Sequence, residues 1–136
     1  MREQKYRVWD GEKMYYPEKI TFTNGLVTHI LTKELRIEFG EECEIISLEF
    51  TGLHDKNGKE IYEGDIVKCS FWTIGEKDGI QYHEKNLVGE VTYLDFQGRY
   101  SVVYGDDYMV TLELGAIEKE VIGNIYENKD LLEVKP

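Results

Sequence analysis

The sequence has few of the residues that break a chain into flexible pieces or join it covalently. Only two prolines occur in 136 residues, Pro17 and Pro136, and the 13 glycines are spread along the chain instead of gathered in a linker. The two cysteines, Cys43 and Cys69, make no CxxC pair. We interpret them as small, reduced hydrophobic residues. These absences exclude a flexible inter-domain linker and a cysteine-based metal knuckle.

Long hydrophobic runs and an excess of positive charge are also lacking. No apolar run approaches the roughly 20 residues that span a bilayer, and the N-terminal MREQKYRVWDGEK has no apolar core of a secretion signal. The 27 acidic and 16 basic residues give a formal net charge of −11, which opposes association with a phosphate backbone or an anionic lipid surface. We therefore expect a cytoplasmic protein that makes no membrane contact and does not bind duplex nucleic acid directly.

Hydrophobic and aromatic residues are plentiful enough for a folded domain. They include ten tyrosines, five phenylalanines and two tryptophans, and 41% of the chain is hydrophobic. Burial of such side chains can offset the entropy that the chain loses on folding. Nearly every apolar segment alternates with a period of two, as half-buried strands do. The sequence predicts a mostly β fold, either all-β or α+β with minor helix.

Turn signals divide the strands into two parts. In residues 1–46, Asp10-Gly11 and Asn24-Gly25 each predict a tight hairpin turn, because these residues tolerate positive φ angles. In residues 47–136, short strands follow one another as in a small SH3-like or partly open β-barrel. We expect an N-terminal β-hairpin subdomain and a small β-barrel-like unit. The expected strands are residues 5–9, 20–23, 26–31, 35–39, 45–50, 66–72, 89–96, 100–104, 108–114 and 121–126.

Two polar segments of the second part carry further expectations. Residues 73–86, TIGEKDGIQYHEKN, predict a long, mobile loop between two strands, where function could reside. Near the C-terminus, the side chain of Asn128 is expected to cap a helical turn over residues 129–132. Leu131 and Leu132 would then dock this turn.

Several motifs together carry a resemblance. The central block of residues 51–68 reads TGLHDKNGKEIYEGDIVK, and residues 122–132 read IGNIYENKDLL. Arg7-Val8-Trp9-Asp10, Met14-Tyr15, Gly89-Glu90-Val91 and Tyr104-Gly105-Asp106 complete the pattern. Over nearly its whole length the chain resembles the YopX family of phage and prophage proteins. The resemblance implies a bacterial host that carries a prophage, and it implies no biochemical activity.

The central block contains residue types found in metal and acid/base sites. His54, Asp55 and Asp65 could form such a cluster, because imidazole and carboxylate groups bind metals and transfer protons. However, Asp and Asn beside glycine ordinarily form turns. In Asp55-Lys56-Asn57-Gly58 we expect the Asp55 carboxylate to accept hydrogen bonds from amides two or three residues further on. A turn explains the Asp and Asn residues of this block better than a metal or acid/base site does.

Other candidate ligands are isolated from each other. Asp106-Asp107 could hold a hard cation, but an EF-hand needs more ligands at fixed spacing, and a hairpin turn explains the pair. His29 and His83 share no ligand spacing. No Gly-x-Ser-x-Gly, Walker or dinucleotide motif occurs. We therefore expect no metal, no cofactor and no catalytic residue, and an enzyme has no support in the sequence.

Four tyrosines in the second part suggest a surface role. Tyr93, Tyr100, Tyr104 and Tyr108 lie on predicted strands and turns, where their rings could stack on single-stranded bases. Because no basic groove surrounds them, core packing or a protein interface explains them better.

Three classes of function follow. The first is a prophage-encoded accessory protein that acts through contacts with an unknown host or phage protein. The second is a nucleic-acid-linked factor, either a weak single-strand binder or an acidic mimic of DNA. The third is an uncharacterised enzyme. We also expect a homo-oligomer, because the strand at Tyr6 to Trp9 and the neighbouring Met14-Tyr15-Tyr16 form a large apolar group beside unpaired strand edges.

Overall fold

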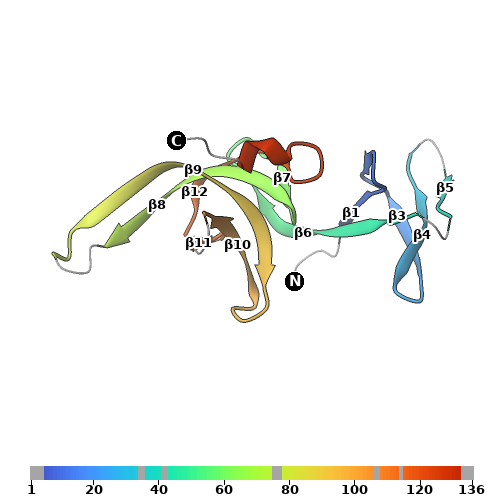
Figure 1. Cartoon of the computed structure of the whole chain (residues 1–136), viewed down its shortest axis with the longest axis horizontal. Helices are drawn as coiled ribbons and strands as arrows, with labels where there is room; N and C mark the ends of the chain where they lie inside the picture. The colour runs from blue at the N-terminus through green and yellow to red at the C-terminus, as the bar shows by residue number, and fades with distance from the viewer. Residues whose placement is uncertain are drawn as a thin grey trace. The chain divides into compact units, whose positions relative to one another are not determined.

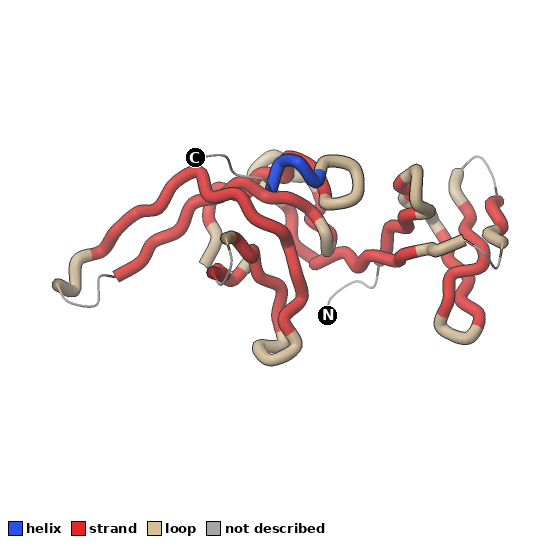
Figure 2. The backbone as a smooth tube through the Cα atoms, in the orientation of Figure 1, coloured by secondary structure: helices blue, strands red, loops and turns tan. Residues whose placement is uncertain are grey.

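The computed structural model describes residues 5–33, 36–40, 43–74, 78–105, 108–113 and 115–132. Strands dominate these residues, and helix is confined to one short segment near the C-terminus (Figure 2). The predicted mostly β fold is confirmed. Within the described part of the chain, no helix has the length and apolar character needed to cross a membrane.

The strands form three sheets, in the orders β2-β1-β6-β7, β11-β10-β9-β8-β12 and β3-β4-β5 (Figure 1). The chain divides into two compact units, residues 1–50 and 51–136, and β6 runs through the boundary. In chain order the elements are β1 (Tyr6–Trp9), β2 (Met14–Tyr15), β3 (Lys19–Thr23), β4 (Leu26–Leu31), β5 (Arg36–Glu38), β6 (Ile46–His54), β7 (Glu60–Tyr62), β8 (Asp65–Ile74), β9 (Gln81–Leu94), β10 (Arg99–Tyr104), β11 (Tyr108–Thr111), β12 (Ile117–Asn124) and the 3-10 helix η1 (Lys129–Leu132).

Both predicted hairpins occur in the first unit. In the turn between β1 and β2, Asp10 Oδ1 accepts hydrogen bonds from the amides of Glu12 and Lys13, at 2.8 and 2.7 Å. In the turn between β3 and β4, Asn24 and Gly25 have φ angles of 54° and 80°. Asn and Gly tolerate such angles better than other residues do. Local turn chemistry therefore determines both hairpins.

Strand β1 lies inside its sheet. It pairs with β2 on one side and with β6 on the other, where Arg7 is opposite Leu48. Val8 is fully buried and forms a small core with Val27 and Ile30. The expectation that the N-terminal strand offers an unpaired edge is therefore wrong, because β6 supplies its second partner.

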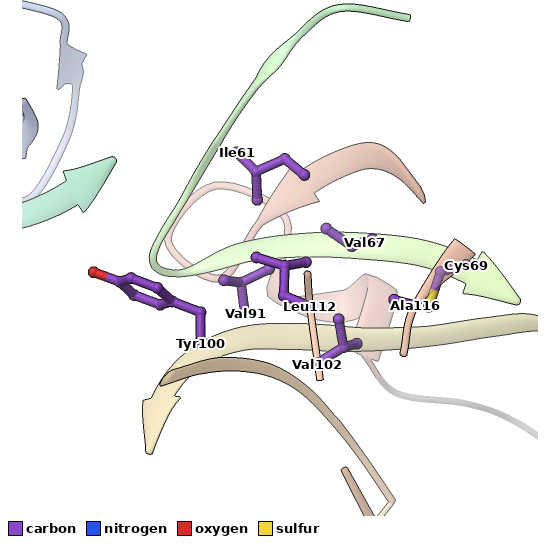
Figure 3. Packing of buried hydrophobic residues seen from close by; sticks show 8 residues of the cluster. All are labelled: Ile61, Val67, Cys69, Val91, Tyr100, Val102, Leu112 and Ala116. Atoms are coloured by element: carbon purple, nitrogen blue, oxygen red, sulfur yellow. The ribbon is translucent and has the colours of Figure 1, made fainter. Parts of the chain in front are cut away.

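The second unit contains the larger core. Its five-stranded sheet curls into a half-barrel (Figure 1), in agreement with the predicted partly open barrel. Buried side chains from β7 to β10 and from the segment that follows β11 gather on one face of this sheet (Figure 3). They are Ile61, Val67, Cys69, Val91, Tyr100, Val102, Leu112 and Ala116.

The turn around Asp55 covers one edge of this sheet. The carboxylate of Asp55 accepts a hydrogen bond from the amide of Asn57 at 2.8 Å, two residues on, as the sequence predicts. It also accepts from the amide of Lys59 at 2.9 Å, which lies four residues on, one position beyond the predicted range. Its other oxygen accepts from the amide of Val121 in β12, at 3.0 Å. The amide of Lys56 donates to the carbonyl of Lys119, also in β12, at 2.8 Å. The outer edge of β12 is therefore hydrogen-bonded, which protects it from pairing with another chain.

Strands β8 and β9 continue well beyond their predicted ends. They pair from Phe71 with Glu84 to Ile74 with Gln81, and a bulge in β9 is accommodated by Asn86 at a φ of 58°. The prediction of a loop over residues 73–86 is therefore wrong for residues 73–74 and 81–86. The cross-strand stack of Trp72 on His83 explains the difference, because such pairs stabilise a two-stranded ribbon even where its composition is polar. Residues 75–77 lie outside the described part.

Other strand boundaries also differ from the predicted ones. Strand β6 passes the predicted end at Phe50 and continues to His54, with Gly52 at a φ of 87°. Strand β7 was not predicted as a separate strand. Strand β12 begins at Ile117, and its register against β8 shifts twice. Such shifts interrupt simple alternation, so the pattern in the sequence underestimates these strands.

The C-terminal turn forms as a 3-10 helix, but its cap differs from the predicted one. Asn128 Oδ1 accepts a hydrogen bond from the amide of Asn124, at 3.2 Å. It therefore ties the turn back to β12 instead of capping the helix. The helix lies against β9, and Leu132 is partly buried, whereas Leu131 remains exposed. The expected docking is therefore not made by Leu131.

Candidate functional site

The candidate ligands of the central block do not form a site. Asp55 uses both of its oxygens for backbone amides. Asp65 is 1% exposed, and its Oδ2 accepts from the amide of Tyr62 at 2.8 Å. His54 is exposed. Among the described residues, no three His, Cys, Asp or Glu side chains are placed to hold a metal ion. Asp106-Asp107 lies outside the described residues.

The shifted pKa of Asp55 has a structural cause. Burial would raise the pKa of this carboxyl, but hydrogen bonds from the amides of Val121, Lys59 and Asn57 outweigh burial and lower it. The pKa of Asp10 is lowered in the same way by the amides of Glu12 and Lys13. Strongly shifted carboxyls often mark catalytic sites. Here both carboxylates hold backbone turns.

The histidines are likewise separate. His29 belongs to the first unit, where its Nε2 lies 3.7 Å from Glu38 Oε2. His83 belongs to the second unit and stacks on Trp72. Nothing in the described structure joins them into a site.

The two cysteines differ in environment. Cys69 is buried in the core, and this burial raises the pKa of its thiol to about 11, although Lys119 acts in the opposite direction. Cys43 is free and exposed. Both cysteines are therefore free thiols, and only Cys69 is buried as a hydrophobic residue would be.

We expect one thiol per folded chain to react quickly with a disulfide reagent at pH 8. Reaction requires the thiolate, which the core environment of Cys69 disfavours. Reaction of the second thiol should require denaturant. The Cys43→Ser variant is the control and should show no fast phase. Two fast thiols in the wild type would show that Cys69 is accessible.

Exposed aromatic residues are the clearest surface feature of the second unit. The rings of Tyr104 and Tyr108 stack with centroids 5.5 Å apart, and Phe71 lies 6.0 Å from Tyr104. Tyr108 is 64% exposed. We call Phe71, Tyr104 and Tyr108 the aromatic patch. It joins β8 to β10 and β11 through side chains on the same face of the sheet.

A second aromatic pair lies on the two-stranded ribbon formed by β8 and β9. Trp72 is 52% exposed and stacks on His83 of β9, with ring centroids 4.4 Å apart and planes at 14°. Successive residues of a strand point to opposite faces, so Trp72 lies on the other face from Phe71. The ribbon therefore presents aromatic side chains on both of its faces.

The four predicted tyrosines have different roles. Tyr100 is 8% exposed and packs edge-on against Tyr93, with centroids 5.1 Å apart. Its ring belongs to the core. Tyr104 and Tyr108 belong to the aromatic patch. The sequence analysis assigned residues 73–86 to a loop and therefore missed the pair of Trp72 and His83. Ile80 and Tyr82, which are β-branched and aromatic, are the signal that could have extended the strand.

Charges in the second unit are mixed as well as acidic. Residues 51–136 contain 17 acidic and nine basic side chains, a formal charge of −8. Lys68 is opposite Glu120 across β8 and β12, and Lys56 Nζ lies 3.7 Å from Glu120 Oε1. A mimic of DNA would need carboxylates gathered on one face. Around β12, acidic and basic side chains lie side by side, which does not support the interpretation of the protein as a mimic of DNA.

Comparisons with known proteins give a matching family and a similar solved structure. A family model described as YopX protein matches residues 5–133. The crystal structure of protein EF1440 from Enterococcus faecalis is similar, with 26% sequence identity and a TM-score of 0.62. That alignment covers 97% of this chain and 99% of the other. No curated protein matches the chain.

Proposed function

This chain belongs to the YopX family, and on that premise we propose that it is a prophage-encoded accessory protein acting through protein contacts. Its place of action is the cytoplasm of a bacterial host. Its partner is a protein of that host or of the phage. Its contact surfaces are the aromatic patch on one face of the sheet that contains β8 and β9, and Trp72 on the other.

The exposure of stacked aromatic rings is the observation that carries this proposal. Trp72 and Tyr108 are more than half exposed, although each is held in place by a neighbouring ring. Trp and Tyr are enriched among the residues that dominate the energy of protein interfaces. A ring that is already ordered loses little side-chain entropy on binding. The ribbon therefore offers preorganised anchors for a partner.

The chemistry of the described titratable groups favours contact over catalysis. The shifted carboxyls Asp10 and Asp55 hold turns, and the thiol of Cys69 is buried. A catalytic group must reach its substrate. These three groups instead stabilise the fold.

A variant comparison in the native host tests this function. Tagged wild type should cross-link to a partner, and Trp72→Ala and Tyr108→Ala should each reduce the cross-linked yield about tenfold, as loss of an interface anchor does. Phe96→Ala is the matched control, because Phe96 is an exposed aromatic residue of the turn between β9 and β10. Equal yields from all three variants would contradict the proposal.

We also propose self-association of the first unit. With β1 paired on both sides, the exposed apolar side chains available for it include Tyr16, Phe22 and Leu26. Light scattering at micromolar concentration should report a mass above the 15.9 kDa of one chain. A monomer throughout a tenfold concentration range would contradict this prediction.

A further inference from the structure

One face of the sheet β3-β4-β5, whose three strands are drawn in Figure 1, carries basic side chains. Lys19 is opposite Leu31, and Leu31 is opposite Arg36, so the two cations flank Leu31 in one row across three strands. At the usual strand spacing their Cα atoms lie about 10 Å apart. In the next row on the same face, Thr21 is opposite His29, and His29 is opposite Glu38.

Lys19, Thr21, His29, Leu31 and Arg36, together with Ile30, line a hollow of about 350 Å³. We call it the cationic hollow. Its volume lies within the range of roughly 300–1,000 Å³ that is typical of small-molecule sites. The side chains of Lys19, Arg36 and Thr21 bring hydrogen-bond donors, and those of Lys19 and Arg36 cannot accept a hydrogen bond. Leu31 contributes an exposed apolar floor between the two cations.

The surrounding chain does not neutralise this face. Within the described residues, neither Lys19 nor Arg36 has a hydrogen-bond or ion-pair partner, although the chain has 27 acidic residues. The carboxylate of Glu38 is directed to His29, at 3.7 Å from Nε2, and His29 Nδ1 lies 3.0 Å from Thr28 Oγ1. His29 is therefore held between two neighbours, while both cations remain available to a ligand.

We propose that the cationic hollow binds a phosphorylated ligand of about nucleotide size. A guanidinium group can hold two phosphate oxygens with parallel hydrogen bonds, and a lysine ammonium adds a point charge. The separation of Lys19 and Arg36 suits two linked phosphate groups better than a single one. Leu31 then lies beneath the body of the ligand. This site belongs to the first unit and is independent of the aromatic contact surfaces.

The test uses the full-length, ¹⁵N-labelled chain, titrated with pyrophosphate, ADP and adenosine at low salt. We expect saturable shifts of the backbone amides of Thr21, His29, Leu31 and Arg36 with pyrophosphate and ADP, and none with adenosine. Tighter binding of ADP would identify a nucleotide as the ligand. Equal binding would identify the diphosphate group itself. Both results support the site.

Paired variants separate a specific site from general electrostatics. Lys19→Ala combined with Arg36→Ala should weaken binding at least about tenfold, because both charge-assisted contacts are lost. The matched control is Lys68→Ala combined with Arg99→Ala, which removes an exposed lysine and an exposed arginine from strands of the second unit. It should change the affinity less than about twofold. Equal weakening by both pairs, amide shifts outside this face, or no saturation by about 10 mM ligand would overturn the proposal.

Discussion

Replacing Asp55 by alanine is expected to lower the free energy of unfolding by about 3 kcal/mol, because three backbone amides lose their acceptor. Two of them, of Asn57 and Lys59, lie in the turn itself, and the third belongs to Val121 in β12. Asp55 is buried, so water replaces the carboxylate poorly. The turn would lose its order and the outer edge of β12 would lose its cover.

Chemical denaturation at pH 7 measures this effect, and two variants locate it. Asp55→Asn keeps one oxygen for the local turn, but its NH₂ group cannot accept a hydrogen bond from the amide of Val121. Its loss of stability should therefore be intermediate. Asp78→Ala is the matched control, because Asp78 accepts from the amide of Ile80 in an exposed turn. Asp78→Ala should change the free energy of unfolding by no more than about 0.5 kcal/mol, as is usual at exposed positions. An equal loss in Asp55→Ala and Asp78→Ala would show that the bond to Val121 adds nothing.

The effect of Asp55 also depends on pH. Its pKa in the folded chain is lowered below the ordinary value of 3.8, so the unfolded chain binds the proton more tightly. The stabilisation is therefore complete above the unfolded pKa and is lost as the pH falls through the folded pKa. The difference in stability between wild type and Asp55→Ala should be constant from about pH 5 to 8 and should shrink below about pH 4. A difference that grows on acidification would have the wrong sign.

Replacing Gly89 by alanine should be similarly severe, with a loss of about 3 kcal/mol from overpacking. A Cβ atom at this position would lie 2.5 Å from the carbonyl oxygen of Val103 and 2.7 Å from Val102 Cγ1. The carbonyl belongs to β10, which pairs with β9, so it cannot move away without disturbing the sheet. Val102 is fully buried in the core and has no room to retreat.

Thermal and chemical unfolding of Gly89→Ala measure this strain. Gly40→Ala is the matched control, because a Cβ atom there meets nothing within 4 Å and the backbone needs no positive φ. It should be neutral within about 0.5 kcal/mol. If Gly89→Ala were as stable as Gly40→Ala, the close approach of β9 and β10 would not constrain this position.

The sequence by itself determined the features that depend on neighbouring residues. Asn24-Gly25 specifies its turn because these two residues accept positive φ angles, and Asp55 specifies a turn because its carboxylate reaches amides two and four residues away. Alternation predicted the β fold, since one face of each strand must be buried. The motifs also indicated the family, which the match over residues 5–133 shows.

Only the tertiary structure decided which distant segments meet. The bond from Val121 to Asp55 joins residues 66 positions apart, and neither local sequence indicates it. Strands β8 and β9 stay paired through a polar segment because Trp72 stacks on His83 across the strands. This pairing depends on the register of the two strands. Lys19 and Arg36 likewise reach one face through β4, which lies between them. Turns follow from short-range sterics and hydrogen bonds, whereas these contacts follow from the packing of the whole sheet, which no local pattern encodes.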